Sequence, residues 1–102
     1  MNDSYRIVIA DEAFNDIQQA LSFLSNVSKA AAEDLSRQIK ATITSLSEFP
    51  FRFEAIGMPK NLGFDFRRVV IERHYLLVYA VKDKQVIVER LIDSRQGFSA
   101  LI

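Results

Sequence analysis

The chain has 102 residues, is 49% hydrophobic and carries 13 basic against 13 acidic side chains. This length and apolar content suit one domain with a single core, so we expect one domain over residues 1–102. The balanced charge gives no bulk attraction to nucleic acid. The absence of cysteine excludes disulfides and thiolate chemistry, and one histidine leaves too few ligands for a zinc cluster, so we expect neither metal nor cofactor.

No apolar run approaches the ~20 residues that a membrane-spanning helix needs. The N-terminus is polar and lacks the basic-then-apolar order of a signal peptide. We therefore expect a cytoplasmic protein that makes no membrane contact.

The first half of the chain predicts one strand and two helices. Residues 5–9 alternate and are β-branched, which indicates a strand. Asp11 is a suitable N-cap for a helix that runs to about residue 25. Its apolar stripe has helical spacing: Phe14, Ile17, Leu21 and Leu24.

Ser28 is placed to cap a second helix, and the proline at position 50 ends it. The apolar residues of this helix again share one face: Leu35, Ile39, Ile43 and Leu46. The connection between the helices is short, which predicts an antiparallel helical hairpin. Two such stripes cannot be buried fully on each other, so the hairpin needs a sheet to cover.

The second half predicts three strands, over residues 66–71, 75–81 and 86–92. Short charged breaks separate them, so neighbouring strands should pair antiparallel. We predict an α+β fold of order β-α-α-β-β-β, with the helical hairpin on one face of a mostly antiparallel four-stranded sheet. Residues 51–63 are expected to be the loop between helices and sheet. Leu21, Leu35 and Ile39 are expected to face Val70 and Val78.

Arginines are the main candidate functional residues. Arg67 and Arg68 are adjacent on a predicted strand, so one should face the helices and the other the open face. Together with Tyr75 and Tyr79, five of them could form a basic surface with aromatic platforms: Arg52, Arg67, Arg68, Arg90 and Arg95. Such a surface suits an RNA backbone or an acidic protein segment. The alternative is that Arg67 and Arg90, with Asp93, make structural ion pairs.

Two further features leave alternatives open. His74 lies in a predicted hairpin turn, where it is either solvated surface or a general base that titrates near neutrality. The apolar tail at residues 98–102 either packs on the core or lies at a partner groove.

The order of these elements and five segments along the chain resemble the RelE/ParE superfamily of toxins from type II toxin–antitoxin systems. The segments are YRIVIADEAFNDI, LSEFPFRF, FRRVVI, YLLVYAV and VIVERLIDSRQ. The resemblance covers nearly the whole chain. It implies a cytoplasmic growth inhibitor of the plasmid-stabilisation type, neutralised by a cognate antitoxin with an acidic amphipathic segment. It leaves a homodimer open.

The superfamily has two branches with different targets. RelE-like members are ribosome-dependent mRNA endoribonucleases, whereas ParE-like members bind and poison DNA gyrase. The nuclease branch has an arginine after the first tyrosine of the third strand, where this chain has Leu76. It has lysines in place of Arg67 and Arg68, and a late tyrosine where this chain has Phe98 and Leu101.

These departures favour the ParE-like branch, with no catalysis. The alternatives are a RelE-like nuclease, or a degenerate, non-toxic member that only binds antitoxin. As a nuclease, the catalytic candidates are Arg67, Arg68, His74 and Arg95. As a binding protein, the residues that contact target or antitoxin are expected to be Arg52, Arg67, Arg68, Tyr79, Arg90 and Arg95.

Overall fold

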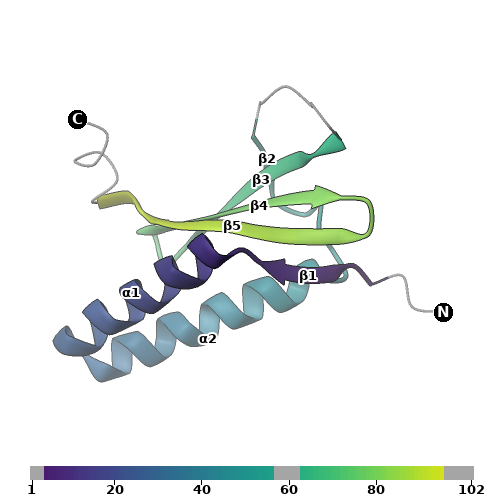
Figure 1. Cartoon of the computed structure of the whole chain (residues 1–102). Coiled ribbons are helices and arrows are strands. Elements are labelled where there is room, and N and C mark those ends of the chain that lie inside the picture. Colours follow the sequence, from purple (N-terminus) through teal and green to yellow (C-terminus); the bar gives the residue numbers. More distant parts are fainter. Residues whose placement is uncertain (1–3, 57–62, 96–102) are drawn as a thin grey trace.

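The computed structural model describes residues 4–56 and 63–95. The elements are β1 Arg6–Ile9, α1 Asp11–Val27, α2 Lys29–Leu46, β2 Glu54–Ala55, β3 Asp65–Ile71, β4 Tyr75–Lys82 and β5 Gln85–Asp93. In Figure 1 the two helices lie side by side along one face of the sheet. The predicted α+β class and the helical hairpin on one sheet face are thus confirmed.

The sheet has five strands in the order β1-β5-β4-β3-β2. β1 runs parallel to β5, and the other neighbouring strands are antiparallel. The prediction of four strands was wrong by one, because residues 54 and 55, expected in a loop, pair with Arg68 and Arg67 of β3. A two-residue strand is too short to show periodicity, and only its partner strand reveals it.

A single residue joins the two helices. The backbone N–H of Ser28 donates to the Leu24 carbonyl of α1, while its hydroxyl accepts from the N–H of Ala31 in α2. Ser28 is therefore the predicted cap of α2 and also ends α1. The prediction of Asp11 as N-cap was wrong: Ala10 holds that position without a side-chain bond, and Asp11 is the first helical residue. There its negative charge still meets the helix dipole favourably.

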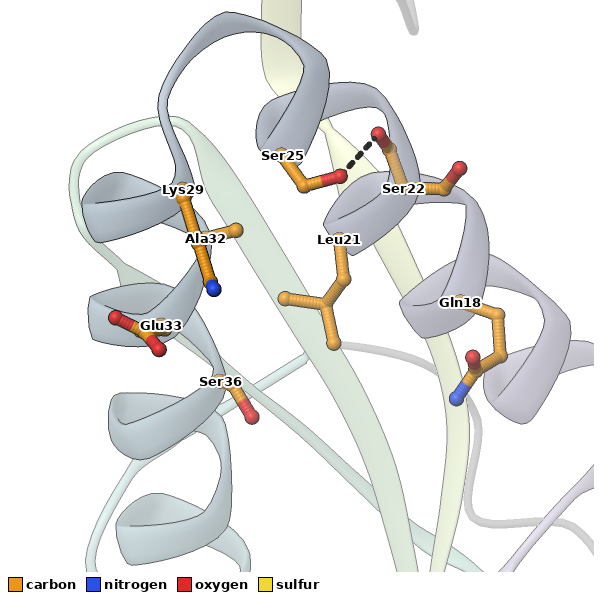
Figure 2. A pocket seen from close by; sticks show the side chains of 8 residues that line it. All are labelled: Gln18, Leu21, Ser22, Ser25, Lys29, Ala32, Glu33 and Ser36. Atoms are coloured by element: carbon orange, nitrogen blue, oxygen red, sulfur yellow. Dashed lines mark hydrogen bonds between the residues drawn. The ribbon is translucent and has the colours of Figure 1, made fainter.

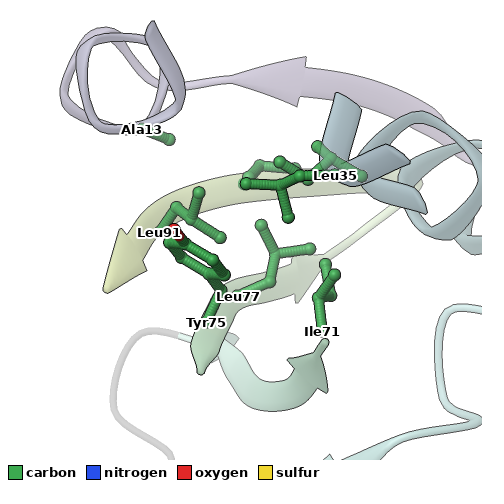
Figure 3. Close-up of a cluster of buried hydrophobic side chains, with 8 residues drawn as sticks. Ala13, Leu35, Ile71, Tyr75, Leu77 and Leu91 are labelled. Carbon is green, nitrogen blue, oxygen red and sulfur yellow. The ribbon is translucent and has the colours of Figure 1, made fainter. Parts of the chain in front are cut away.

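The core lies between the helices and one face of the sheet (Figure 3). Leu35 of α2 is fully buried with Leu77 of β4, and Ile39 is nearly so. The expected contact with Val70 and Val78 was wrong, since these residues alternate to the opposite face, where Val70 is 61% exposed. Both faces of β3 and β4 are rich in apolar residues, so alternation alone did not reveal which face the helices cover.

A β-bulge interrupts the pairing of β4 with β5. Tyr79 pairs with Val88 and Val78 pairs with Arg90, so Glu89 is the extra residue. The bulge shifts the alternation of β5, and Leu91 returns to the helix-covered face. None of the helices in the described part of the chain is long and apolar enough to cross a membrane.

Candidate functional site

Arg67 lies on the helix-covered face of β3 and holds the turn that follows α2. Its Nη1 donates to the carbonyls of Phe51, at 3.1 Å, and Phe53, at 2.7 Å. Its Nη2 donates to the Asp65 carboxylate at 3.2 Å. The side chain is 18% exposed, so these bonds replace water for a mostly buried cation.

Tyr79 supports the same turn from the neighbouring strand. It is fully buried, and its hydroxyl donates to the Pro50 carbonyl at 2.7 Å. Burial raises the pKa of Tyr79 from 10.0 to about 12, although the nearby Arg67 acts in the opposite direction. The phenol is therefore neutral across the physiological range and serves as a hydrogen-bond donor to the backbone.

Cations and aromatic rings gather around Arg67 at the end of the sheet where β1 begins and β4 turns into β5. Four cation–ring pairs lie there: Arg52 over Phe53, Arg67 over Phe51, Lys82 over Phe64 and Lys84 over Tyr5, at 4.5–5.1 Å from the ring centroids. The rings of Tyr5 and Phe51 also meet edge to face. We call these eight residues the cation–aromatic end.

Arg68 points to the open face of the sheet. Its Nε donates to the Glu54 carboxylate of β2 at 3.1 Å, and its side chain is 48% exposed. An exposed pair of this kind contributes little to stability. The Arg68 guanidinium is thus accessible to a partner, with one carboxylate already beside it.

Arg90 tethers α1 to the edge of β5. Its Nε donates to Asp16 at 2.7 Å, and the same carboxylate accepts the backbone N–H of Leu91 at 3.0 Å. The hydrogen bond from Arg90 to Asp16 raises the pKa of the guanidinium. β1 pairs with β5 only as far as Val88. The N–H of Leu91 therefore has no acceptor on β1, and the Asp16 carboxylate accepts its hydrogen bond instead.

His74 and Arg95 lie at the opposite end of the sheet from the cation–aromatic end. Arg95 donates to both Asp93 oxygens at 3.1 Å and to the Tyr75 hydroxyl at 3.4 Å. The hydrogen bonds from Arg95 lower the pKa of Asp93. The nearby His74 acts on this pKa in the same direction. The adjoining turn has positive φ at Glu72 (50°) and Arg73 (68°), which is uncommon outside glycine.

The structure therefore divides the predicted site residues into separate groups. Arg52, Arg67 and Tyr79 lie together at the cation–aromatic end. His74 and Arg95 lie together at the other end of the sheet. Arg68 lies on the open face, and Arg90 lies at the β5 edge. Sequence reasoning missed the lysines and rings that complete the cation–aromatic end: Tyr5, Phe51, Phe53, Phe64, Lys82 and Lys84. Two sequence segments, FRF at residues 51–53 and KDK at residues 82–84, place aromatic or basic residues close together. They were the local signal from which these residues could have been recognised. The expected tail at residues 98–102 lies outside the described residues.

A shallow groove of about 360 Å³ runs between the outward surfaces of α1 and α2 (Figure 2). It is lined by Gln18, Leu21, Ser22, Ser25, Lys29, Ala32, Glu33 and Ser36. Only Leu21 offers a large apolar side chain, and the charged groups of opposite sign, Lys29 and Glu33, lie on the same helix. The groove brings no catalytic combination together.

Solved structures show where this fold occurs. Residues covering 89% of this chain superpose on a chromosomal ParDE toxin–antitoxin system from P. aeruginosa with a TM-score of 0.67, 15% identity and 97% coverage of that chain. An archaeal RelE–RelB complex from Pyrococcus horikoshii gives a TM-score of 0.62, 20% identity, and coverage of 89% and 96%. The chain therefore has the α+β fold that is found in these two toxin–antitoxin systems.

Sequence comparison with family models then gives the family. The model described as ParE toxin of type II toxin–antitoxin system, parDE, matches residues 7–98. The chain belongs to this family of toxins, as the resemblance implied. A search of curated proteins found no match.

Proposed function

We propose that this ParE-family chain is a growth inhibitor of the cytoplasm that binds DNA gyrase, performs no catalysis, and is neutralised by a cognate antitoxin. Family membership supports the toxin role. The two structural neighbours, a ParDE system and a RelE–RelB complex, support an antitoxin partner. The choice of gyrase rests on the site chemistry.

The observation that carries the choice is that two of the four catalytic candidates, Arg67 and Arg95, and both tyrosines of β4 are engaged in hydrogen bonds within the chain. Arg67 is bonded to two carbonyls and a carboxylate, and the Tyr79 hydroxyl is bonded to a carbonyl. Arg95 is bonded to Asp93 and also donates to the hydroxyl of Tyr75, a residue that is only 4% exposed. Cleavage of RNA at a 2′-hydroxyl needs a general base within reach of that group. Of the described tyrosines on β4, neither offers an accessible phenol for that role.

Purified protein should inhibit DNA supercoiling by gyrase and accumulate cleaved DNA–gyrase complexes at micromolar concentration. Induced expression without the neighbouring antitoxin gene should stop growth. If growth stops while gyrase is unaffected, gyrase is not the target. If growth continues normally, the chain is a degenerate member that keeps the fold and only pairs with an antitoxin.

A second candidate function, ribosome-dependent mRNA cleavage, is favoured by one observation. His74 is exposed at the end of the sheet that also holds Asp93 and the 48% exposed Arg95. In this candidate function the imidazole would act as the general base and the guanidinium would bind the phosphate. Translation-dependent mRNA cleavage that is lost in His74→Ala and in Arg95→Ala would support this candidate. Cleavage that survives both substitutions, and Arg68→Ala as well, would remove these residues from any catalytic role.

A further inference from the structure

We infer that the cation–aromatic end binds a carboxylate-rich segment of the antitoxin, an inference that rests on the proposed toxin–antitoxin function. Positive charge is in local excess at this end of the sheet. Arg67 is matched by Asp65, and Asp83 offsets part of the charge in the turn between Lys82 and Lys84. Within residues 4–56 and 63–95, Arg52 and Lys82 have a ring contact but no ion pair.

The aromatic rings hold these cations in place. The Arg52 guanidinium lies 4.7 Å from the Phe53 centroid and the Lys82 ammonium lies 4.5 Å from the Phe64 centroid. A cation stacked on a ring has lost part of its conformational freedom before a ligand arrives, so less entropy is lost on binding. A guanidinium can then receive a carboxylate through its remaining N–H groups.

The cation–aromatic contacts continue around the end of the sheet from one face to the other. Lys84 contacts Tyr5, whose ring meets Phe51, and Phe51 lies beneath Arg67 on the helix-covered side. On the other side, the ring under Lys82 is stacked on Phe66. Ten extended residues span about 33 Å, which exceeds the 22 Å short axis of the molecule. One extended peptide can therefore reach cations on both sides.

The same geometry decides between an acidic peptide and a single-stranded nucleic acid. Nucleic acid would use the rings as stacking platforms for bases. Here each of the four rings already carries a cation on one face, and three of them also contact another ring. What remains available is the charge, which favours carboxylates placed along an extended chain.

The test measures binding of fluorescein-labelled decaglutamate to the full-length chain by anisotropy, with decathymidylate as the nucleic-acid probe. The double variant Arg52→Gln/Lys82→Gln should bind decaglutamate about tenfold more weakly, since two charge contacts are lost. Binding by the wild type should also weaken as salt is raised. The matched control Lys29→Gln/Lys40→Gln removes the same charge from α2 and should bind as the wild type does.

Conservative Arg52→Lys/Lys82→Arg should retain most of the binding, which separates loss of charge from loss of fold. Equal weakening in the two glutamine variants, or no binding by the wild type, would overturn the inference. Tighter binding of decathymidylate with the same dependence on Arg52 and Lys82 would replace it with a nucleic-acid site. Growth inhibition in the absence of antitoxin tests the proposed function separately, because it does not involve the peptide.

Discussion

At the scale of single residues, two polar side chains decide how the chain leaves α2. Tyr79 and Arg67 both reach carbonyls of residues 50–53, and both lie on the face of the sheet that the helices cover. A buried carbonyl without a donor costs about as much as a lost hydrogen bond, so these side chains make the turn compatible with burial. The buried Arg67 Nε has no hydrogen-bond partner among the described residues, which makes the guanidinium's remaining bonds more important.

Removing the phenol of Tyr79 tests this arrangement. Tyr79→Phe should lower the free energy of unfolding by about 1–2 kcal/mol, because the Pro50 carbonyl loses its donor. Urea denaturation measures this loss. Tyr5→Phe is the control, since within the described residues the Tyr5 hydroxyl makes no hydrogen bond. A loss as large in Tyr5→Phe would show that the bond to Pro50 is not the cause.

The raised pKa of Tyr79 gives the same residue a pH dependence. The unfolded tyrosine ionises near 10.0 and the folded one near 12, so burial of the neutral phenol contributes stability that is complete below pH 10. That contribution should be lost progressively between pH 10 and 12. Titration by phenolate absorbance should show a group near pH 12 that is absent in Tyr79→Phe. If no group disappears in that variant, the assignment fails.

At the scale of elements, two short connections depend on particular residues. Ser28 alone joins α1 to α2 and satisfies backbone groups of both helices. The turn between β3 and β4 places Glu72 and Arg73 at positive φ, which strains residues that carry a Cβ. Glu72 is partly held there by Gln38 of α2, whose amide donates to its carboxylate at 3.0 Å. Each connection therefore depends on one or two side chains.

Ser28→Ala should lower the free energy of unfolding by about 1 kcal/mol, the usual value for loss of an N-cap hydroxyl. Ser25→Ala is the matched control, because its hydroxyl donates to an exposed carbonyl within α1 and caps nothing. Thermal or urea unfolding of the pair measures the difference. Equal stability of the two variants would contradict the capping role.

Arg73→Gly should raise the free energy of unfolding by about 1 kcal/mol, because glycine adopts φ of 68° without a Cβ penalty. Arg73→Ala removes the same charge but keeps the Cβ, so it should give no such gain. The two denaturation midpoints therefore separate relief of strain from a charge effect. A gain shared by both variants would attribute it to the charge.

At the scale of the whole molecule, the sheet is covered by helices on one face and open on the other. The covered face holds fully buried residues such as Leu35 and Leu77, while the open face exposes Val70 and carries Arg68. Most of the folding free energy should therefore come from a single layer of contacts. The arginines of the open face and of the sheet ends are left to interact with partners.

Leu35→Ala should lower the free energy of unfolding by about 2–5 kcal/mol, because it opens a cavity between α2 and the sheet. Val70→Ala should change it by less than about 1 kcal/mol, since the side chain is 61% exposed. Urea denaturation of both variants compares the two faces directly. A larger loss for Val70→Ala would mean that the open face is covered in solution.

The sequence alone determined the element order, the helical hairpin and the three long strands, and it suggested the family. These features are local: periodicity of 3.6 or 2 and a capping serine act within a few residues. Tertiary structure decided the strand β2, the sheet face that the helices cover, and the partners of each arginine. Those depend on residues distant in the chain, such as Asp16 with Arg90 and Pro50 with Tyr79, whose meeting follows only from packing the layers together.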